Sequence, residues 1–182
     1  MNLRGINYKT SLKSCTCVPK MNVLYNVTTD LTGGCLAFVA HDCPQTFHYV
    51  IESHKCYKYI NDANNWSVSR KLCNDMLNSH PVIFDEANEA TAIILYMKSR
   101  SYVYSWTAGY VNYTNGLAFH WGPYPGITRP IDPNVTFWYP GAPYPFGGGT
   151  DCIEFMPRFG GCWFDYYCDV TQSVLCEYDV VF

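Results

Sequence analysis

The ten cysteines are the residues of this 182-residue chain whose chemistry is easiest to identify. So many cysteines in a chain of this size indicate disulfide bonds and an oxidising compartment. Four Asn-X-Ser/Thr sequons agree with this interpretation. Their acceptors are Asn26, Asn65, Asn112 and Asn134. We therefore expect a secreted or extracellular glycoprotein. Because residues 1–9 contain no apolar signal-peptide core, we expect the sequence to be a mature form or fragment.

Composition and motifs argue against several functions. The net charge of -3 and the pI near 5.9 give no basic surface of the kind that binds nucleic acid. The longest apolar run, Ala92–Met97, is far too short to span a bilayer. The five histidines lack metal-ligand spacing, and no nucleophile or phosphate-binding motif is present. We expect no enzymatic activity.

Aromatic residues make up 17% of the chain. Tyrosine and tryptophan join a large apolar face to a polar tip, which suits a binding surface. The alternative interpretation is that many of them fill a β-rich core.

The first 42 residues predict a cysteine-containing extension with a strand or two and turns. Cys15, Cys17 and Cys35 lie among polar residues and short apolar runs. Structural disulfides are the favoured interpretation, and a metal site is the alternative, although no histidine lies at a known spacing.

From Cys43 onward the pattern predicts alternating secondary structure. Cys43 and Cys56 flank a hairpin, and Asn65 precedes a helix that we expect to run from Trp66 to His80-Pro81.

A second helix should follow the short apolar strand Val82–Phe84. Asp85 is the expected cap of this helix, which should cover Glu86 to about Lys98. Its apolar face should hold Ala87, Ala90, Ile94 and Met97.

Strands and one long loop complete the prediction. Tyr102–Gly109 and Phe119–Trp121 alternate like strands. Residues 122–150 are rich in proline, glycine and aromatic residues, and a loop of that length is usually functional or disordered. Three short strands should follow around the last cysteines.

This order of elements resembles the long form of the C-type lectin-like domain. The similarity covers Cys43 to Glu177 and rests on several pieces in sequence. They are the Cys43/Cys56 hairpin, the Cys73 helix, Trp106-Thr-Ala-Gly109, the Trp138…Pro140-Gly-Ala-Pro143 loop and the Cys152…Trp163…Cys168…Cys176 set. The resemblance implies an α+β fold with two helices flanking antiparallel sheets, an extension at residues 1–42 and a lectin-like domain at residues 43–182.

The resemblance also implies three disulfide pairs. They are Cys43–Cys56, Cys73–Cys176 and Cys152–Cys168. The second closes the largest loop, and on the chain-entropy model this disulfide stabilises the folded state by roughly 4–5 kcal/mol. Cys15, Cys17, Cys35 and Cys162 remain, and their pairing stays open. We expect Cys162 to bond the extension to the domain, with an interchain disulfide, and hence a homo-oligomer, as the alternative.

In sugar-binding members of the family, the resemblance places Ca²⁺ and sugar on the long loop and the adjacent strand. The family's ligand triplets align with Ala142-Pro143-Tyr144 and Trp163-Phe164-Asp165, and a further acidic position aligns with Thr150. Only Asp165 keeps its usual ligand type. One carboxylate does not hold Ca²⁺ at useful affinity, so we expect no cofactor and no metal here.

Aromatic side chains are expected to replace the metal. The candidate ligand-binding residues are Tyr139, Tyr144, Phe146, Phe164 and Asp165, whereas Trp138 and Trp163 are expected in the core. The predicted function is calcium-independent recognition of a glycan or glycoprotein. The alternative is a protein-binding adhesion module without sugar activity. A third candidate, a matrix or mineral-surface protein, is disfavoured because acidic residues are few and not clustered.

Overall fold

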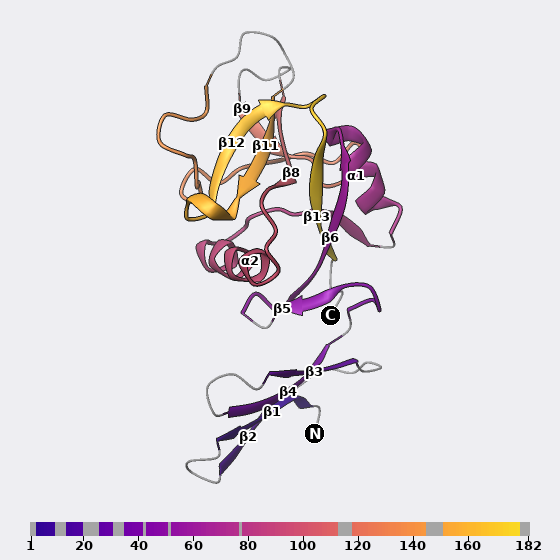
Figure 1. Ribbon diagram of the computed structural model, residues 1–182, viewed down its shortest axis with the longest axis vertical. Helices are drawn as coiled ribbons and strands as arrows, with labels where there is room; N and C mark the ends of the chain where they lie inside the picture. Colours follow the sequence, from indigo (N-terminus) through magenta and orange to yellow (C-terminus); the bar gives the residue numbers. More distant parts are fainter. Residues whose placement is uncertain are drawn as a thin grey trace.

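The computed structural model describes residues 3–9, 14–19, 26–30, 35–41, 43–50, 52–76, 78–112, 118–144 and 151–178, with side chains from residue 43 onward except at Asn88 and Asn112. These residues form two sheets that share no strand, one of four strands and one of nine (Figure 1). In the described part of the chain, no helix is long and apolar enough to cross a membrane.

The first sheet is antiparallel and has the order β2-β1-β4-β3. Its strands are β1 (Leu3–Lys9), β2 (Ser14–Pro19), β3 (Asn26–Asp30) and β4 (Cys35–His41). The sequence predicted only a strand or two here. Short segments such as β3 have a weak strand signal of their own, and pairing with a neighbour satisfies their backbone groups.

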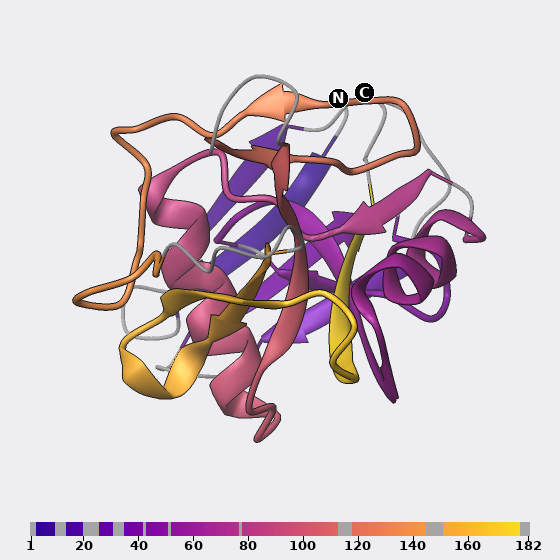
Figure 2. The same cartoon turned by 90° about the horizontal axis from the view of Figure 1, so that it is seen from above.

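The second sheet has the order β10-β9-β8-β13-β6-β5, with β11 and β12 attached to β8 and with β7 beside β13. Its strands are β5 (His48–Val50), β6 (Lys55–Asn64), β7 (Ser79–Pro81), β8 (Ser105–Asn112), β9 (Ala118–Trp121), β10 (Arg129–Pro130), β11 (Asp151–Met156), β12 (Cys162–Tyr167) and β13 (Gln172–Tyr178). The helices are α1 (Trp66–Asn74), α2 (Ala87–Ser99) and the short 3₁₀ helix η3 (Pro157–Phe159). Helices α1 and α2 lie on either side of the central strands (Figures 1 and 2). The expected α+β class is confirmed.

Helix α1 begins where the sequence predicts. The side chain of Asn65 accepts a hydrogen bond of 3.0 Å from the amide of Val68, which satisfies a free donor of the first turn. Its predicted end at His80-Pro81 is wrong, because α1 stops at Asn74 and Ser79–Pro81 forms β7. The backbone of Pro81 lies opposite Cys176 of β13, so sheet pairing replaces helix there.

The predicted start of α2 needs a correction. Its cap residue is Glu86, and the Asp85 side chain instead forms an ion pair with Arg129. The amide of Asp85 donates a 3.0 Å hydrogen bond to Glu89, whose carboxylate lies in the first turn of the helix. The expected strand Val82–Phe84 is buried but forms no strand, although the Val82 amide still donates to the Leu175 carbonyl at 2.8 Å.

Two further predictions differ from the structure: the apolar face of α2 and the start of β8. Of the expected apolar face of α2, Ala90 and Met97 are buried, whereas Ala87 is exposed. Ile93 is fully buried in its place. Strand β8 begins at Ser105 rather than Tyr102.

The core beneath the long loop is aromatic. Trp163 is fully buried, and rings that surround it lie 5.3 to 5.6 Å away by centroid. They belong to Phe84, Trp121, Phe137 and Trp138. The three disulfides that the resemblance implies, Cys43–Cys56, Cys73–Cys176 and Cys152–Cys168, are all formed.

A buried ion cluster joins β6, β13 and α2. The Lys55 ammonium lies 2.6 Å from Glu177 and 2.5 Å from Glu89, and Tyr57 donates to Glu89 at 3.1 Å. Burial alone would lower the pKa of Lys55, but the two carboxylates outweigh it and raise that pKa. Burial raises the pKa of Glu177, which Lys55 opposes. The lysine therefore compensates two carboxylates that are almost fully removed from solvent.

Candidate functional site

The long loop is attached to β12 by backbone hydrogen bonds. The Trp163 amide donates to the Phe137 carbonyl at 2.7 Å, and the Tyr139 amide donates to the Trp163 carbonyl at 3.0 Å. Between them, the Trp138 ring meets Trp163 edge-on, with the ring centroids 5.6 Å apart. Trp163 lies in the core as expected, and Trp138 is half-buried against it. This attachment fixes where Tyr139 emerges.

Tyr139 emerges beside Phe164 on the surface of β12. Their rings stack with centroids 4.6 Å apart and an interplanar angle of 25°. Phe159 of η3 completes the group, with its ring 5.8 Å from Tyr139 and 6.1 Å from Phe164. Phe159 is 56% exposed, whereas the other two are half-buried. We call Tyr139, Phe159 and Phe164 the aromatic patch.

Phe159 was not among the predicted site residues. It directly precedes Gly160-Gly161, and a large apolar side chain next to two glycines is a signal for an exposed turn. The signal was weak because η3 cannot be anticipated from three residues.

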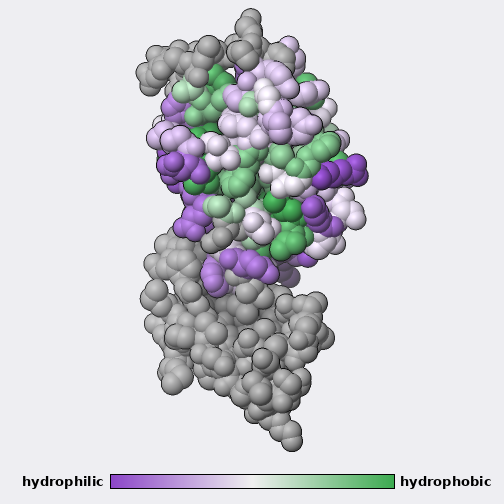
Figure 3. Space-filling model, turned by 90° about the vertical axis from the view of Figure 1, so that its left-hand side faces the viewer, coloured by the Kyte–Doolittle hydropathy of each residue, from purple (hydrophilic) through white to green (hydrophobic). Residues whose placement is uncertain are grey.

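Figure 3 faces the side where Figure 1 draws α2 and segment 122–144, and there apolar residues form patches among hydrophilic ones.

The other predicted loop residues are only partly placed. Tyr144 is 48% exposed and follows a cis Ala142–Pro143 peptide bond. Phe146 and Thr150 lie outside the described residues.

Asp165 does not join the aromatic patch. Successive strand residues point to opposite faces, so Asp165 lies on the face of β12 opposite to Phe164. It is only 4% exposed, and neither carboxylate oxygen has a hydrogen-bond partner. Asp165 lies opposite Ile153 in the β11–β12 ladder, and Asp151 is the diagonal neighbour on the same face.

The described residues do not fit the calcium site that the family resemblance implies. Calcium takes six to eight oxygen ligands, and at the aligned positions Ala142 and Phe164 have no side-chain oxygen. In the portion of the chain described by the structure, no three His, Cys, Asp or Glu side chains gather into a metal-binding group. Among the aligned positions that the structure describes, only Asp165 offers a carboxylate, and this is too few oxygens to hold Ca²⁺.

Among the described residues, Cys162 has no disulfide partner, and its thiol donates a hydrogen bond of 2.8 Å to the Phe159 carbonyl. The expected disulfide to the extension stays a prediction. Burial raises the pKa of this thiol, which keeps it protonated and suits a donor role. The side chains of Cys15, Cys17 and Cys35 lie outside the described residues.

Solved structures share this fold. Human lithostathine superposes with a TM-score of 0.62 at 19% identity, covering 76% of this chain and 92% of lithostathine. The cow C-type carbohydrate-recognition domain of CD23, solved in the presence of a GlcNAc2Man3 oligosaccharide, gives 0.61 at 23%, covering 78% and 99%. A calcium-independent type II antifreeze protein gives 0.60 at 18%, covering 77% and 96%.

No family model and no curated relative matches the sequence. The fold identification therefore rests on three-dimensional similarity, and the three neighbours agree on it. Together with the three disulfides and the aromatic core around Trp163, this similarity shows that the disulfide-bonded part of the chain has the C-type lectin-like fold.

Proposed function

We propose that this chain is an extracellular recognition module that binds a glycan or glycoprotein without calcium. The observation that carries the proposal is the stacked, partly exposed aromatic patch beside the long loop. Ring faces of this kind stack on the apolar face of a sugar and also anchor protein partners.

Calcium independence is part of the proposal. The donor set around Asp165 lacks the oxygens that Ca²⁺ needs, and the aromatic patch lies on the other face of β12. One neighbour is named a calcium-independent antifreeze protein, so the fold exists without that metal. A ligand that binds to the aromatic patch would therefore need no contact with the face of β12 that carries Asp165.

An extracellular location is supported by the three disulfides, which persist in oxidising compartments. Glycosylation at Asn26, Asn65, Asn112 and Asn134 remains a prediction of the sequence.

A protein-binding module without sugar activity is the second candidate. It is favoured by Phe159, an exposed phenylalanine, because phenylalanine offers a protein partner an apolar anchor and offers a sugar no hydrogen bond. The two candidates share the aromatic patch and differ in the ligand.

A glycan array probed with and without EDTA separates them. The proposal predicts the same glycan hits in both conditions, and weaker binding by at least tenfold for Phe159→Ala. Val68→Ala is the matched control, because Val68 is also exposed and lies on α1, away from β12 (Figure 1). Hits that disappear with EDTA would contradict calcium independence. No hits in either condition would leave the protein-binding candidate.

A further inference from the structure

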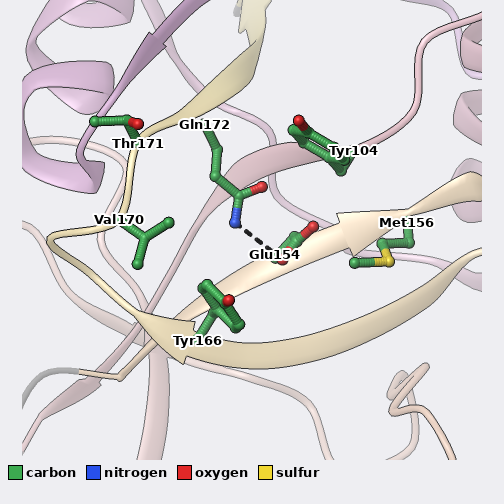
Figure 4. A pocket seen from close by; sticks show the side chains of 7 residues that line it. All are labelled: Tyr104, Glu154, Met156, Tyr166, Val170, Thr171 and Gln172. Atoms are coloured by element: carbon green, nitrogen blue, oxygen red, sulfur yellow. Dashed lines mark hydrogen bonds between the residues drawn. The ribbon is translucent and has the colours of Figure 1, made fainter.

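A second site lies on the same face of the β11–β12 hairpin as the aromatic patch. It is a pocket of about 280 Å³ formed by β11, β12 and the segments that lead into β8 and β13. Its lining residues are Tyr104, Glu154, Met156, Tyr166, Val170, Thr171 and Gln172 (Figure 4). Tyr139, Tyr144, Phe164 and Asp165 are not among them.

Glu154 is the one charged residue of this lining. It is 3% exposed and comes from β11, a strand paired on both sides, so the backbone holds the side chain in place. The Gln172 amide donates to Glu154 Oε2 at 2.9 Å. Among the described residues, Glu154 forms no ion pair, and Gln172 is its one side-chain hydrogen-bond partner. A buried carboxylate thus faces the pocket without a counter-ion, although burying an unpaired charge is costly.

Two tyrosines flank that carboxylate. Figure 4 shows Tyr104 and Tyr166 on either side of Glu154, with Met156 at the edge. Both tyrosines are exposed, at 40% and 42%, so their rings are accessible to a ligand. An aromatic ring attracts a cation to its face, and a carboxylate attracts it further. Aromatic rings around an acidic group are the chemistry that recognises an organic ammonium or guanidinium group.

We propose that the pocket around Glu154 binds an organic cation, with the Glu154 carboxylate as counter-ion and Tyr104 and Tyr166 as its aromatic walls. Such a ligand supplies the positive charge beside Glu154 that none of the described residues provides. A neutral polyhydroxyl ligand would leave the buried charge uncompensated. The cation is either a small quaternary amine such as choline or a Lys or Arg side chain of a protein, and the chemistry is shared by both. The proposal does not depend on the aromatic patch.

The test titrates four probes into the whole chain. Calorimetry and NMR chemical shifts measure the binding of each probe. The probes are choline, its neutral carbon isostere 3,3-dimethylbutan-1-ol, N-acetyl-lysine methylamide and N-acetyl-arginine methylamide. We expect at least one cation to bind, and the neutral isostere to bind at least tenfold more weakly. Preference for choline identifies a small-molecule or headgroup source, and preference for lysine or arginine identifies a protein side chain.

Variants locate the binding. Glu154→Gln keeps the shape and the hydrogen bond with Gln172 but removes the charge, so cation affinity should fall at least tenfold. Tyr166→Leu should weaken it by a smaller factor, and Phe159→Ala should leave it unchanged. Because Glu154→Gln removes a buried charge, the variant should fold, and its thermal unfolding checks this. Failure of every cation to bind, equal binding of the neutral isostere, or unchanged affinity in Glu154→Gln would overturn the proposal. Loss of glycan binding alone would not.

Discussion

Glu154 and Phe164 lie directly opposite each other on β11 and β12. Side chains of such a pair point to the same face of the sheet, so the pocket and the aromatic patch form one continuous surface. Asp165, the next residue along β12, points to the opposite face. The surface proposed for recognition is thus separated by the hairpin itself from the one carboxylate that the family resemblance associates with calcium.

Asp165 should lower stability, because both of its buried carboxylate oxygens lack hydrogen-bond partners. Because Asp165→Asn removes a buried charge that has no partner, we expect it to raise the free energy of unfolding by about 1–3 kcal/mol, measured by urea denaturation. Asp62→Asn, at an exposed position, is the control and should change little. If adding Ca²⁺ raises the melting temperature of the native chain and not of Asp165→Asn, a metal occupies this position and the calcium-independent account fails.

Lys55 should be essential for the buried ion cluster. Lys55→Met leaves Glu89 and Glu177 uncompensated and should cost about 3–5 kcal/mol. Lys71→Met breaks an exposed i,i+4 pair with Asp75 and should cost only about 0.3–0.5 kcal/mol. Chemical denaturation of both variants compares them. Equal losses would show that burial does not set the strength of the Lys55 cluster.

Two adjacent glycines give a matched test of the contact between α2 and the β11–β12 turn. Gly160 and Gly161 both have positive φ, of 79° and 84°. A Cβ at Gly160 meets open space, whereas one at Gly161 would overlap the Ile94 side chain. Gly160→Ala should cost about 1–2 kcal/mol from backbone strain alone. Gly161→Ala should cost about 1–3 kcal/mol more from overpacking.

The double variant Gly161→Ala/Ile94→Ala isolates that overlap. Its loss should be smaller than the sum of the two single losses, because Ile94→Ala makes room for the new methyl group. Strictly additive losses, measured by the same denaturation, would contradict the predicted contact.

Glu154 should make stability depend on pH. Burial raises the pKa of its carboxyl, and the Gln172 hydrogen bond opposes this in part. The folded state therefore holds the proton more tightly than the unfolded state. The protonated Glu154 carboxyl therefore adds to the free energy of unfolding. This contribution is complete at pH values below 4.5, the ordinary pKa of the carboxyl, and is lost as the pH rises through the folded-state pKa. The other lining residues of the pocket carry no charge at these pH values, so none offsets it.

Glu154→Gln should accordingly gain stability relative to the native chain as pH rises from 4 towards neutrality. Urea unfolding at a series of pH values measures the difference. A bound organic cation should shrink the difference at neutral pH, since it stabilises the ionised native protein. A difference that stays constant with pH would mean that the Glu154 carboxyl is not perturbed by burial.

Local signals predicted much of the fold. Asn65 was recognisable as a cap because its side chain serves an amide three residues away. The disulfide partners followed from the family resemblance, not from spacing. Asp85 looked equally like a cap, but Arg129, 44 residues further on, forms an ion pair with its carboxylate. No local pattern reveals such a competitor.

The site was only partly predictable for a similar reason. Tyr139 and Phe164 were identified from their aromatic side chains, and strand alternation alone would have separated Phe164 from Asp165. The pocket was not predictable, because Tyr104, Glu154 and Gln172 come from three segments that meet only through the pairing of β11 with β8 and the entry into β13.

The central claim is tested most directly by titrating a glycan, or a glycoprotein carrying it, into the native chain and into Phe159→Ala, each with and without EDTA. The account predicts that EDTA leaves the native affinity unchanged and that Phe159→Ala binds at least tenfold more weakly in both conditions. Affinity that is lost with EDTA and is insensitive to Phe159→Ala would contradict it.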